Sequence, residues 1–304
     1  MRSLSPLAAI LVATLAFPSF ANAAGAADIP VGMVEEPCLP ALAIPPSAVK
    51  LLTELFLEPR TLVPADFARL GQNPDFTAFQ KESMRRGAMD WAGLCRFHHA
   101  NAEVAAAASR PKVVFMGDSI TENWGLADPA FFTAGLVNRG ISAQTSAQML
   151  VRFRADVVAL RPGVVHILAG TNDVAGNNGP TSPKDFQNNI QSMVELARAN
   201  GIAVVLGSIP PAATFSWRPE LQPVPRIRAL NNWLRDYATR NKLTYIDYYA
   251  ALTGPAGELL PAFSNEGVHP NRDGYVVMRR LAERALAGAT RTTTTAPASS
   301  PAAR

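Results

Sequence analysis

The sequence predicts an α/β protein, a three-layer α/β/α sandwich built around a parallel sheet. Five short apolar runs alternate with segments of helical periodicity, and no obvious hairpin joins any two of them. Such alternation implies right-handed crossovers and a sheet covered by helices on both faces. The 304 residues are 48% hydrophobic and 17% charged, so we expect one sizeable core, and therefore one domain with appendages. The expected strands are residues 113–116, 136–138, 164–168, 203–207 and 243–246.

Residues 1–23 are expected to form a signal peptide. An apolar stretch from Leu7 to Phe17 precedes Ala21-Asn22-Ala23, which is a small-x-small cleavage site. A membrane anchor is the alternative, but the stretch is shorter than the ~20 residues that a bilayer span needs. We therefore expect a soluble mature chain that begins near Ala24, is periplasmic or secreted, and has no stable membrane span.

Residues 24–110 are expected to form an N-terminal arm and a helical extension. The arm is rich in Ala and Pro, and helical periodicity begins near Pro46. The extension should cover part of the core, and the sequence leaves open whether it also borders a functional cleft. Cys38 and Cys95 are the two cysteines of a chain bound for an oxidising compartment, which is consistent with one disulfide. Two buried free thiols are the alternative.

No metal site is predicted. His98 and His99 are adjacent in a segment of helical periodicity, where neighbouring side chains point about 100° apart. The formal net charge is +4, and the basic residues are spread along the chain rather than grouped in blocks. Nucleic-acid binding is therefore not expected.

Residues 111–288 are expected to form the α/β domain. Within it, Ser182-Pro183-Lys184-Asp185 predicts a helix start, with an N-cap serine, a proline at the first helical position and an acid at the third. A Pro-rich loop is expected at 208–225, and the last helix should follow Asn271 and run past Leu286. Residues 289–304 are dominated by Thr, Ala, Ser and Pro, which predicts a disordered tail.

Four residues with chemical potential fall after predicted strands. Ser119 follows the first strand, Gly140 the second and Asn172 the third, while His269 lies between the fifth strand and the last helix. The carboxyl ends of parallel strands share one edge of a sheet, so these residues can converge there. Acyl transfer needs a nucleophile, a base, a group that orients the base, and donors for the oxyanion.

Those roles can be assigned to residues of this chain. Ser119 would be the nucleophile, His269 the base and Glu266 the orienting carboxylate. The oxyanion donors would be the backbone N–H groups of Ser119 and Gly140 together with the Asn172 amide. For Ser119 taken alone, a simple helix N-cap is an equally good interpretation.

These residues resemble the four signature blocks of the SGNH hydrolases, also called the GDSL esterase/lipase family. The matching blocks are Gly117-Asp118-Ser119-Ile120, the later Gly140, Gly170-Thr171-Asn172-Asp173 and the closing acid-x-x-His-Pro. The likeness covers roughly residues 111–286 and is greatest to bacterial members of the platelet-activating-factor acetylhydrolase type. It implies a flavodoxin-like sheet of order 2-1-3-4-5 and a serine esterase mechanism without a metal or cofactor.

One residue departs from the family pattern. The family usually has Asp three residues before the histidine, whereas this chain has Glu266, whose extra methylene the loop must absorb. The alternative is a solvated loop carboxylate, with a backbone carbonyl or water orienting His269. Trp124 and Trp217 are candidates for lining the substrate pocket, with ordinary packing and a surface loop as the respective alternatives.

The sequence therefore predicts an exported serine esterase acting on short-chain acyl or lysophospholipid-like esters. A carbohydrate O-acetylesterase is the alternative within the same chemistry. A catalytically inactive binding or scaffold protein is the alternative of another class, and it would require a damaged nucleophile, base or oxyanion site. The expected partner is a small-molecule or carbohydrate ester, and the sequence predicts no oligomeric state.

Overall fold

The centre of the molecule is a sheet of five parallel strands in the order β2-β1-β3-β4-β5. The computed structural model describes residues 29–30, 32–133 and 135–293. The three-layer architecture and the strand order expected from the family resemblance are confirmed. The strands are β1 Val113–Gly117, β2 Leu136–Gly140, β3 Val164–Leu168, β4 Ala203–Gly207 and β5 Thr244–Ile246.

Alternate residues of the strands are buried in two separate cores, one on each face of the sheet. Val114 and Met116 of β1 lie in a cluster with side chains of α6, α8 and α9, whereas Val113 and Phe115 lie in a cluster with side chains of α5 and α11. This is the period-two alternation of a strand buried on both sides. The helices of this domain are α5 Ser119–Ala127, α6 Ser146–Asp156, α7 Thr171–Ala175, α8 Pro183–Ala199, α9 Pro223–Arg240, α10 Tyr248–Leu252 and α11 Arg272–Thr293, with a 3-10 turn η2 at Val158–Leu160.

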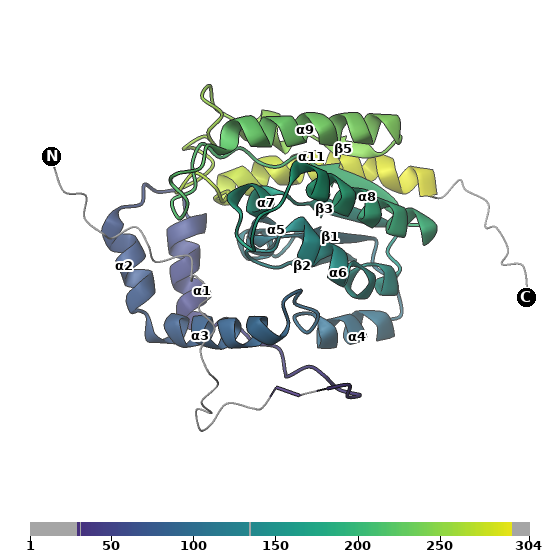
Figure 1. Cartoon of the computed structure of the whole chain (residues 1–304), viewed down its shortest axis with the longest axis horizontal. Helices are drawn as coiled ribbons and strands as arrows, with labels where there is room; N and C mark the ends of the chain where they lie inside the picture. Colours follow the sequence, from purple (N-terminus) through teal and green to yellow (C-terminus); the bar gives the residue numbers. More distant parts are fainter. Residues whose placement is uncertain (1–28, 31, 134, 294–304) are drawn as a thin grey trace, which may run out of the picture.

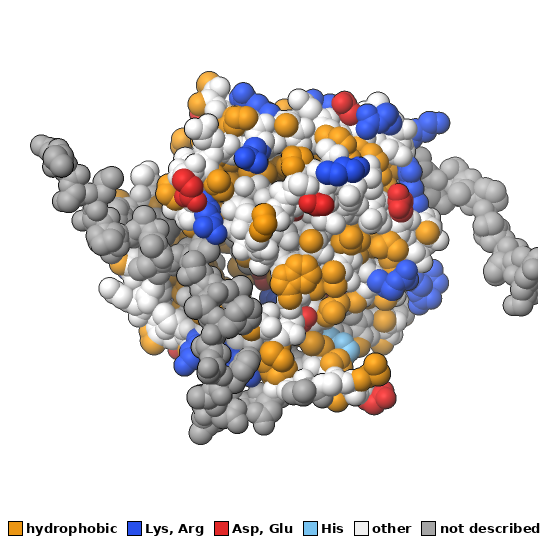
Figure 2. Space-filling view, in the orientation of Figure 1, with side chains coloured by type: hydrophobic (Ala, Val, Ile, Leu, Met, Phe, Trp, Pro, Cys, Tyr) orange, Lys and Arg blue, Asp and Glu red, His pale blue; other side chains and the backbone are white. Residues whose placement is uncertain are grey.

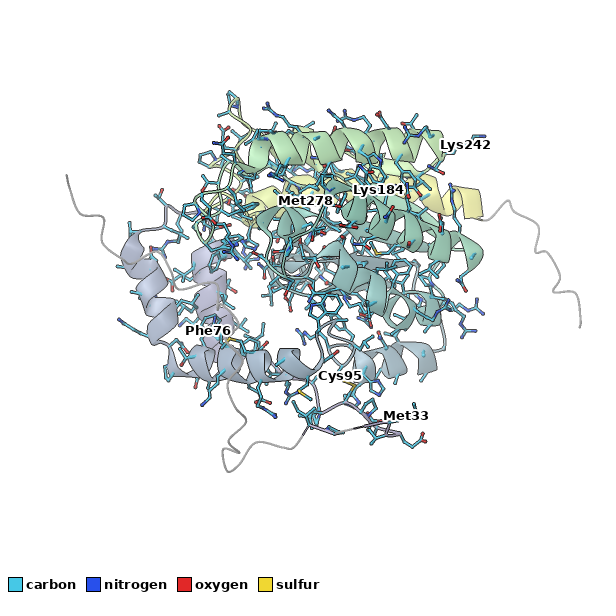
Figure 3. All side chains as sticks on the ribbon, viewed as in Figure 1. Met33, Phe76, Cys95, Lys184, Lys242 and Met278 are labelled. Carbon is cyan, nitrogen blue, oxygen red and sulfur yellow. A yellow bond between two sulfur atoms is a disulfide. The ribbon has the colours of Figure 1, made fainter. Side chains whose placement is uncertain are left out.

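A set of helices precedes the sheet and runs along one side and the lower rim of the α/β domain (Figure 1). Its first four helices share a small core of Ala48, Leu51, Leu55, Leu70 and Phe76, and Phe76 lies on α3 (Figure 3). The elements are α1 Pro46–Leu52, the π-helix η1 Thr53–Leu57, α2 Pro64–Gln72, α3 Pro74–Met89 and α4 His98–Ala106. We call the segment from α1 to α4 the helical extension.

A disulfide joins Cys38 to Cys95, with Cα atoms 5.2 Å apart (Figure 3). It ties the N-terminal arm to the turn that precedes α4. The predicted signal peptide, residues 1–23, lies outside the described residues. Among the helices that the structure describes, none combines the length and the apolar character that crossing a membrane requires.

The last helix extends beyond its predicted end. The tail was expected from residue 289, but α11 continues to Thr293, and Ala289 is buried in the core cluster. Ala289 prolongs the inward stripe of Met278, Ala282 and Leu286 by nearly one further turn, so a small residue suffices to keep the helix packed. The remaining predicted tail, residues 294–304, lies outside the described part of the chain.

Candidate active site

The turn after β1 places Ser119 at the first position of α5. Asp118 is the N-cap, and its carboxylate accepts a hydrogen bond of 2.9 Å from the backbone N–H of Ile120. The N–H groups of a helix's first turn have no partners within the helix. Because β1 ends at Gly117, the hydroxyl and the backbone N–H of Ser119 lie at the carboxyl edge of the sheet. Ser119 itself is half-buried.

Ser119, His269 and Glu266 form a continuous hydrogen-bonded series. The Ser119 Oγ lies 2.9 Å from the His269 Nε2, and the His269 Nδ1 lies 3.0 Å from the Glu266 Oε1. The Glu266 side chain is 8% exposed and that of His269 17% exposed, so the pair is largely removed from water. This is the arrangement of nucleophile, base and orienting carboxylate that acyl transfer requires.

The loop before His269 accommodates the longer glutamate by folding around its carboxylate. Glu266 Oε1 accepts from the backbone N–H groups of Val268, at 3.0 Å, and of His269. Gly267 has φ of 87°, a left-handed conformation that glycine adopts without steric cost. Ser264 supports the turn, because its hydroxyl accepts from the N–H of Gly267 at 2.9 Å. The extra methylene is thus absorbed by a tight turn, and the carboxylate still reaches the imidazole.

The charges of this pair stabilise each other. Burial by itself would lower the pKa of His269, but the carboxylate of Glu266 and its hydrogen bond, aided by Asp118, raise the pKa above 6.5. Burial by itself would raise the pKa of Glu266, but the nearby His269 and the N–H donors hold this pKa below its usual range. The site therefore favours an imidazolium facing a carboxylate, the charge state that forms when a base accepts a proton from serine.

Asp118 is the second carboxylate of the site and is fully buried. Burial raises the pKa of Asp118 to about 6, against the opposing effects of the Ile120 N–H and the charge of His269. Its other oxygen accepts from the Asn172 Nδ2 at 3.2 Å. Asp118 thus fixes the Ser119 turn and the Asn172 side chain relative to each other.

Two of the three expected oxyanion donors already have acceptors within the protein. The backbone N–H of Gly140 donates to the Asn138 Oδ1 at 2.8 Å. The Asn172 Nδ2 donates to Asp118 and, at 3.1 Å, to the carbonyl of Gln144. The donors are therefore held at the sheet edge by local partners. A substrate oxygen would have to share them or displace one of these bonds.

Gly140 is required by close packing. A Cβ at this position would lie 2.2 Å from the backbone nitrogen of Glu122 and 2.8 Å from the carbonyl oxygen of Asp118. Those atoms belong to the backbone at the start of α5 and cannot rotate away. The end of β2 thus packs directly against the segment that carries Ser119.

Comparison with known proteins agrees with this geometry. The sequence profile of the GDSL-like lipase/acylhydrolase family matches residues 115–277, which is more than half of the chain. The chain belongs to this family. The prediction made from the four sequence blocks is confirmed, and the family makes this GDSL protein a carboxylic ester hydrolase.

Named relatives of this GDSL hydrolase include an esterase and two solved structures. Esterase TesA of Pseudomonas aeruginosa is 28% identical over 179 residues, which cover 54% of this chain and 81% of TesA. A GDSL-like lipase from Bacteroides thetaiotaomicron is 43% identical, with a TM-score of 0.62 and coverage of 65% of this chain and 98% of the lipase. A Bacteroides fragilis protein assigned as an acylhydrolase is 45% identical, with a TM-score of 0.63 and coverage of 66% and 99%.

The two tryptophans predicted to line the pocket of the GDSL hydrolase have different environments. Trp124 is 0% exposed and stacks between Phe131 and Tyr275, so the prediction that it contacts substrate is wrong. It follows Ile120 by one helical turn, on the face of α5 that packs on the core. Trp217 is half-buried, and its Nε1 donates to the Asn177 Oδ1 at 2.9 Å.

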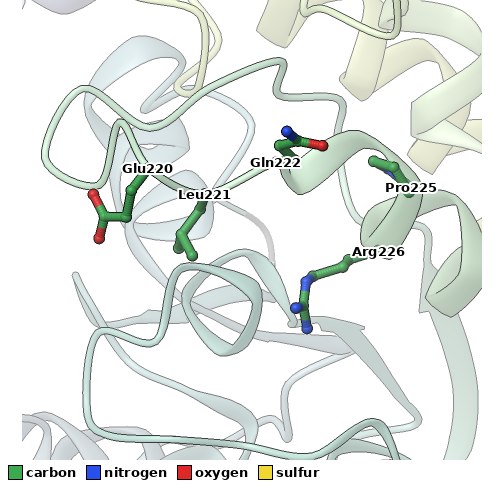
Figure 4. Close-up of a pocket in the computed structure, with 5 residues that line it drawn as sticks. All are labelled: Glu220, Leu221, Gln222, Pro225 and Arg226. Atoms are coloured by element: carbon green, nitrogen blue, oxygen red, sulfur yellow. The ribbon is translucent and has the colours of Figure 1, made fainter.

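The 208–222 loop of the GDSL hydrolase is linked to Asn172, one of the expected oxyanion donors, through Trp217 and Asn177. Asn177, the acceptor for Trp217, also donates a hydrogen bond from its amide to the Asn172 Oδ1. A cavity of about 370 Å³ lies on the same loop and the start of α9, lined by Glu220, Leu221, Gln222, Pro225 and Arg226 (Figure 4). None of its lining residues belongs to the Ser119 site, so we do not assign the ester to it.

One group of side chains in the GDSL hydrolase has metal-binding geometry. Glu36, His98 and His99 offer ligand atoms within 4.8 Å of one another, and the His98 Nε2 lies 3.1 Å from the Glu36 Oε1. The side chains of these adjacent histidines were expected to point apart. At the first turn of α4, however, their imidazole centroids are only 5.1 Å apart. The group is largely exposed, and it lies close in sequence to the two cysteines of the Cys38–Cys95 disulfide.

Several residues around the site carried no sequence signal. Asn138 and Gln144 bind the expected oxyanion donors Gly140 and Asn172, and Asn265 binds the helical extension. Phe56 of η1 lies with its ring centroid 6.2 Å from that of His269. Asn138 and Gln144 lie close to Gly140 in sequence, and this was the only signal that could have indicated them. Asn265 lies next to the last block, and Phe56 lies outside all four blocks.

Proposed function

We propose that this protein is an exported serine esterase that forms an acyl-enzyme on Ser119. The observation that carries the proposal is the series Ser119–His269–Glu266, with contacts of 2.9 Å and 3.0 Å at the carboxyl edge of the sheet. All three parts of a triad are thus present in hydrogen-bonding order. An inactive scaffold with a damaged nucleophile or base is not supported by this arrangement.

The reaction follows from the contacts. Ser119 Oγ attacks the ester carbonyl carbon while its proton passes to the His269 Nε2, and Glu266 stabilises the resulting imidazolium. The tetrahedral oxyanion accepts hydrogen bonds from the oxyanion site. The bond between carbon and the alcohol oxygen then breaks, and the His269 Nε2 returns its proton to that oxygen.

Deacylation repeats the same steps with water. His269 removes a proton from water, the hydroxide adds to the acyl carbon, and Ser119 leaves with the proton returned by His269. The Ser119 N–H is the donor that needs no rearrangement, because it lies in the first turn of α5. Gly140 and Asn172 would donate in addition by sharing their hydrogens with the substrate oxygen.

The substrate class we favour is short-chain acyl or lysophospholipid-like esters. The activity named for the relative TesA is that of an esterase. A carbohydrate acetyl ester is the second candidate. It is favoured by the half-buried Trp217, whose ring is held beside the Asn172 loop where a sugar could stack.

We also propose that the protein is exported to the periplasm or secreted. The apolar segment Leu7–Phe17 with its following cleavage site supports this, and so does the Cys38–Cys95 disulfide, since disulfides persist in oxidising compartments. On the face shown in Figure 2, Lys and Arg side chains are spread among acidic ones rather than gathered in one stripe. The charge on this face is consistent with the proposal, made from the sequence, that the substrate is an ester rather than a nucleic acid.

The test is hydrolysis of p-nitrophenyl esters from acetate to palmitate by the mature protein and by Ser119→Ala, together with acetylated sugars. We expect turnover that is abolished in Ser119→Ala, with a maximum at short or medium acyl length. Activity confined to acetylated sugars would favour the carbohydrate esterase. Turnover that is equal in both proteins would refute the proposed nucleophile.

A further inference from the structure

The residue before Glu266 ties the His269 loop to the helical extension. The Asn265 Nδ2 donates to the carbonyls of Leu55, at 2.8 Å, and of Glu58, at 2.7 Å, and its Oδ1 accepts from the backbone N–H of Arg60 at 3.3 Å. These partners precede Asn265 by 205 to 210 residues. A single side chain thus binds three backbone groups of a segment that lies far away in sequence.

The bonds satisfy groups that the end of η1 leaves open. The last carbonyls of a helix have no partner within the helix. Asn265 supplies both amide hydrogens to carbonyls at this end, and Arg272, at the start of α11, adds a salt bridge to Glu58 at 2.8 Å. The segment that carries His269 is therefore fastened to η1 on both sides of the histidine.

Phe56 turns from the same π-helix toward His269. Its neighbours Leu55 and Leu57 are buried in two different cores, which fix the backbone, whereas Phe56 itself is half-buried. Its ring meets the imidazole edge to face, with centroids 6.2 Å apart and an interplanar angle of 75°. The departing alcohol must lie near the Nε2 of this imidazole to receive its proton, and Phe56 is an aromatic side chain that packs beside the same ring.

The family model matches the chain from residue 115, so η1 and Phe56 lie before the matched part. A π-helical turn is rare and is often found at functional sites. From these contacts we infer that the helical extension completes the active site: Asn265 is a positioning residue for His269, and Phe56 forms a wall that selects the alcohol part of the ester. The inference rests on the proposed role of His269 as the base.

The test uses Asn265→Ala and Phe56→Ala in the full mature chain. Asn73→Ala is the matched control, because the Asn73 side chain caps α3 inside the extension through the N–H of Phe76 at 2.9 Å, and no hydrogen bond among the described residues links it to the His269 loop. Each variant is assayed on an acyl series with one alcohol and on an alcohol series with one acyl group. Hydrogen exchange of residues 264–270 is measured in parallel.

Asn265→Ala should lower kcat by about ten- to a hundredfold on every ester with KM nearly unchanged, because the base is less well placed. It should also speed exchange in residues 264–270, and Asn73→Ala should do neither. Phe56→Ala should reduce kcat/KM by about tenfold for bulky alcohols and little for methyl esters, with the order of preference along the acyl series unchanged.

Two results would overturn the inference while the proposed function stands. One is a Ser119-dependent enzyme in which Asn265→Ala matches Asn73→Ala in both kcat and exchange. The other is a Phe56→Ala variant that changes the acyl and alcohol series equally or changes neither. Absence of Ser119-dependent turnover in the parent enzyme would instead defeat the proposed function, and this inference with it.

Discussion

Replacing Glu266 by glutamine tests whether a glutamate completes the triad. Its Oε1 lies 3.0 Å from the His269 Nδ1, and at an effective dielectric constant of about 20 two unit charges at that distance attract by about 5 kcal/mol. Glutamine keeps the shape and a hydrogen bond but loses the charge, so part of this stabilisation remains. We expect kcat to fall by about 10²- to 10³-fold, equivalent to about 3–4 kcal/mol.

The pH profile of the same variant provides an independent reading. His269 must be neutral to accept the serine proton, so kcat/KM should fall as pH drops through the pKa of His269. In the parent this pKa is raised above 6.5 by Glu266 and Asp118, against the effect of burial. Removing the Glu266 charge should move the midpoint to lower pH.

The assay is steady-state hydrolysis of p-nitrophenyl acetate between pH 5 and 9. Glu258→Gln is the matched control, because Glu258 is a loop carboxylate that accepts from a backbone N–H, that of Ala256 at 2.8 Å, without contacting His269. A Glu266→Gln enzyme within about threefold of the parent, with an unmoved midpoint, would refute the reasoning. His269 would then be oriented by a backbone carbonyl or water.

Three further predictions concern stability. Gly140→Ala should lower the free energy of unfolding by about 3 kcal/mol or more in urea titration, because its Cβ would lie 2.2 Å from the Glu122 nitrogen. Loss of the Cys38–Cys95 disulfide, which spans 57 residues, should cost up to about 4 kcal/mol on the chain-entropy model, measured by unfolding of the double Ala variant. His166 is buried, and burial lowers its pKa to about 3. The loss in free energy of unfolding caused by His166→Leu should therefore be about 2 kcal/mol smaller at pH 5 than at pH 6.5.

The sign of the His166 prediction follows from linkage. The unfolded chain protonates this histidine below about pH 6.5, whereas the folded chain does not until about pH 3, so the parent loses this part of its stability as pH falls. Asp118 acts in the opposite direction, since its folded pKa is about 6. Comparing the variant with the parent at each pH cancels the Asp118 contribution. A His166→Leu effect that does not depend on pH would contradict the burial argument. A Gly140→Ala protein as stable as the parent would contradict the packing argument. A double Ala variant as stable as the parent would contradict the stabilising role of the disulfide.

Local signals predicted the elements whose stabilising contacts are local. Ser182 caps α8 as expected, because its hydroxyl and the Asp185 carboxylate exchange hydrogen bonds with each other's backbone N–H groups. The strand ends that carry Ser119, Gly140 and Asn172 followed from periodicity and from the shared edge of a parallel sheet. The family blocks then supplied the strand order.

Contacts between distant segments were not predictable where the residues belong to no motif. The partners of Asn265 lie 205 to 210 residues away, and no pattern near residue 265 indicates them. Trp124 was predicted to line the pocket because it lies close to Ser119 in sequence, whereas its spacing of four from the buried Ile120 places it on the core face of α5. The reach of Glu266 depended on the backbone turn at Gly267, which a spacing alone does not define.

The most direct test of the account is to identify the residue that carries the acyl group. The mature enzyme is mixed with p-nitrophenyl acetate, quenched in acid during the first turnovers and mapped by peptide mass spectrometry. We predict an acetyl group on Ser119, its accumulation before steady state, and its absence in Ser119→Ala along with turnover. An acetyl group on another residue, or turnover that persists in Ser119→Ala, would contradict the central claim.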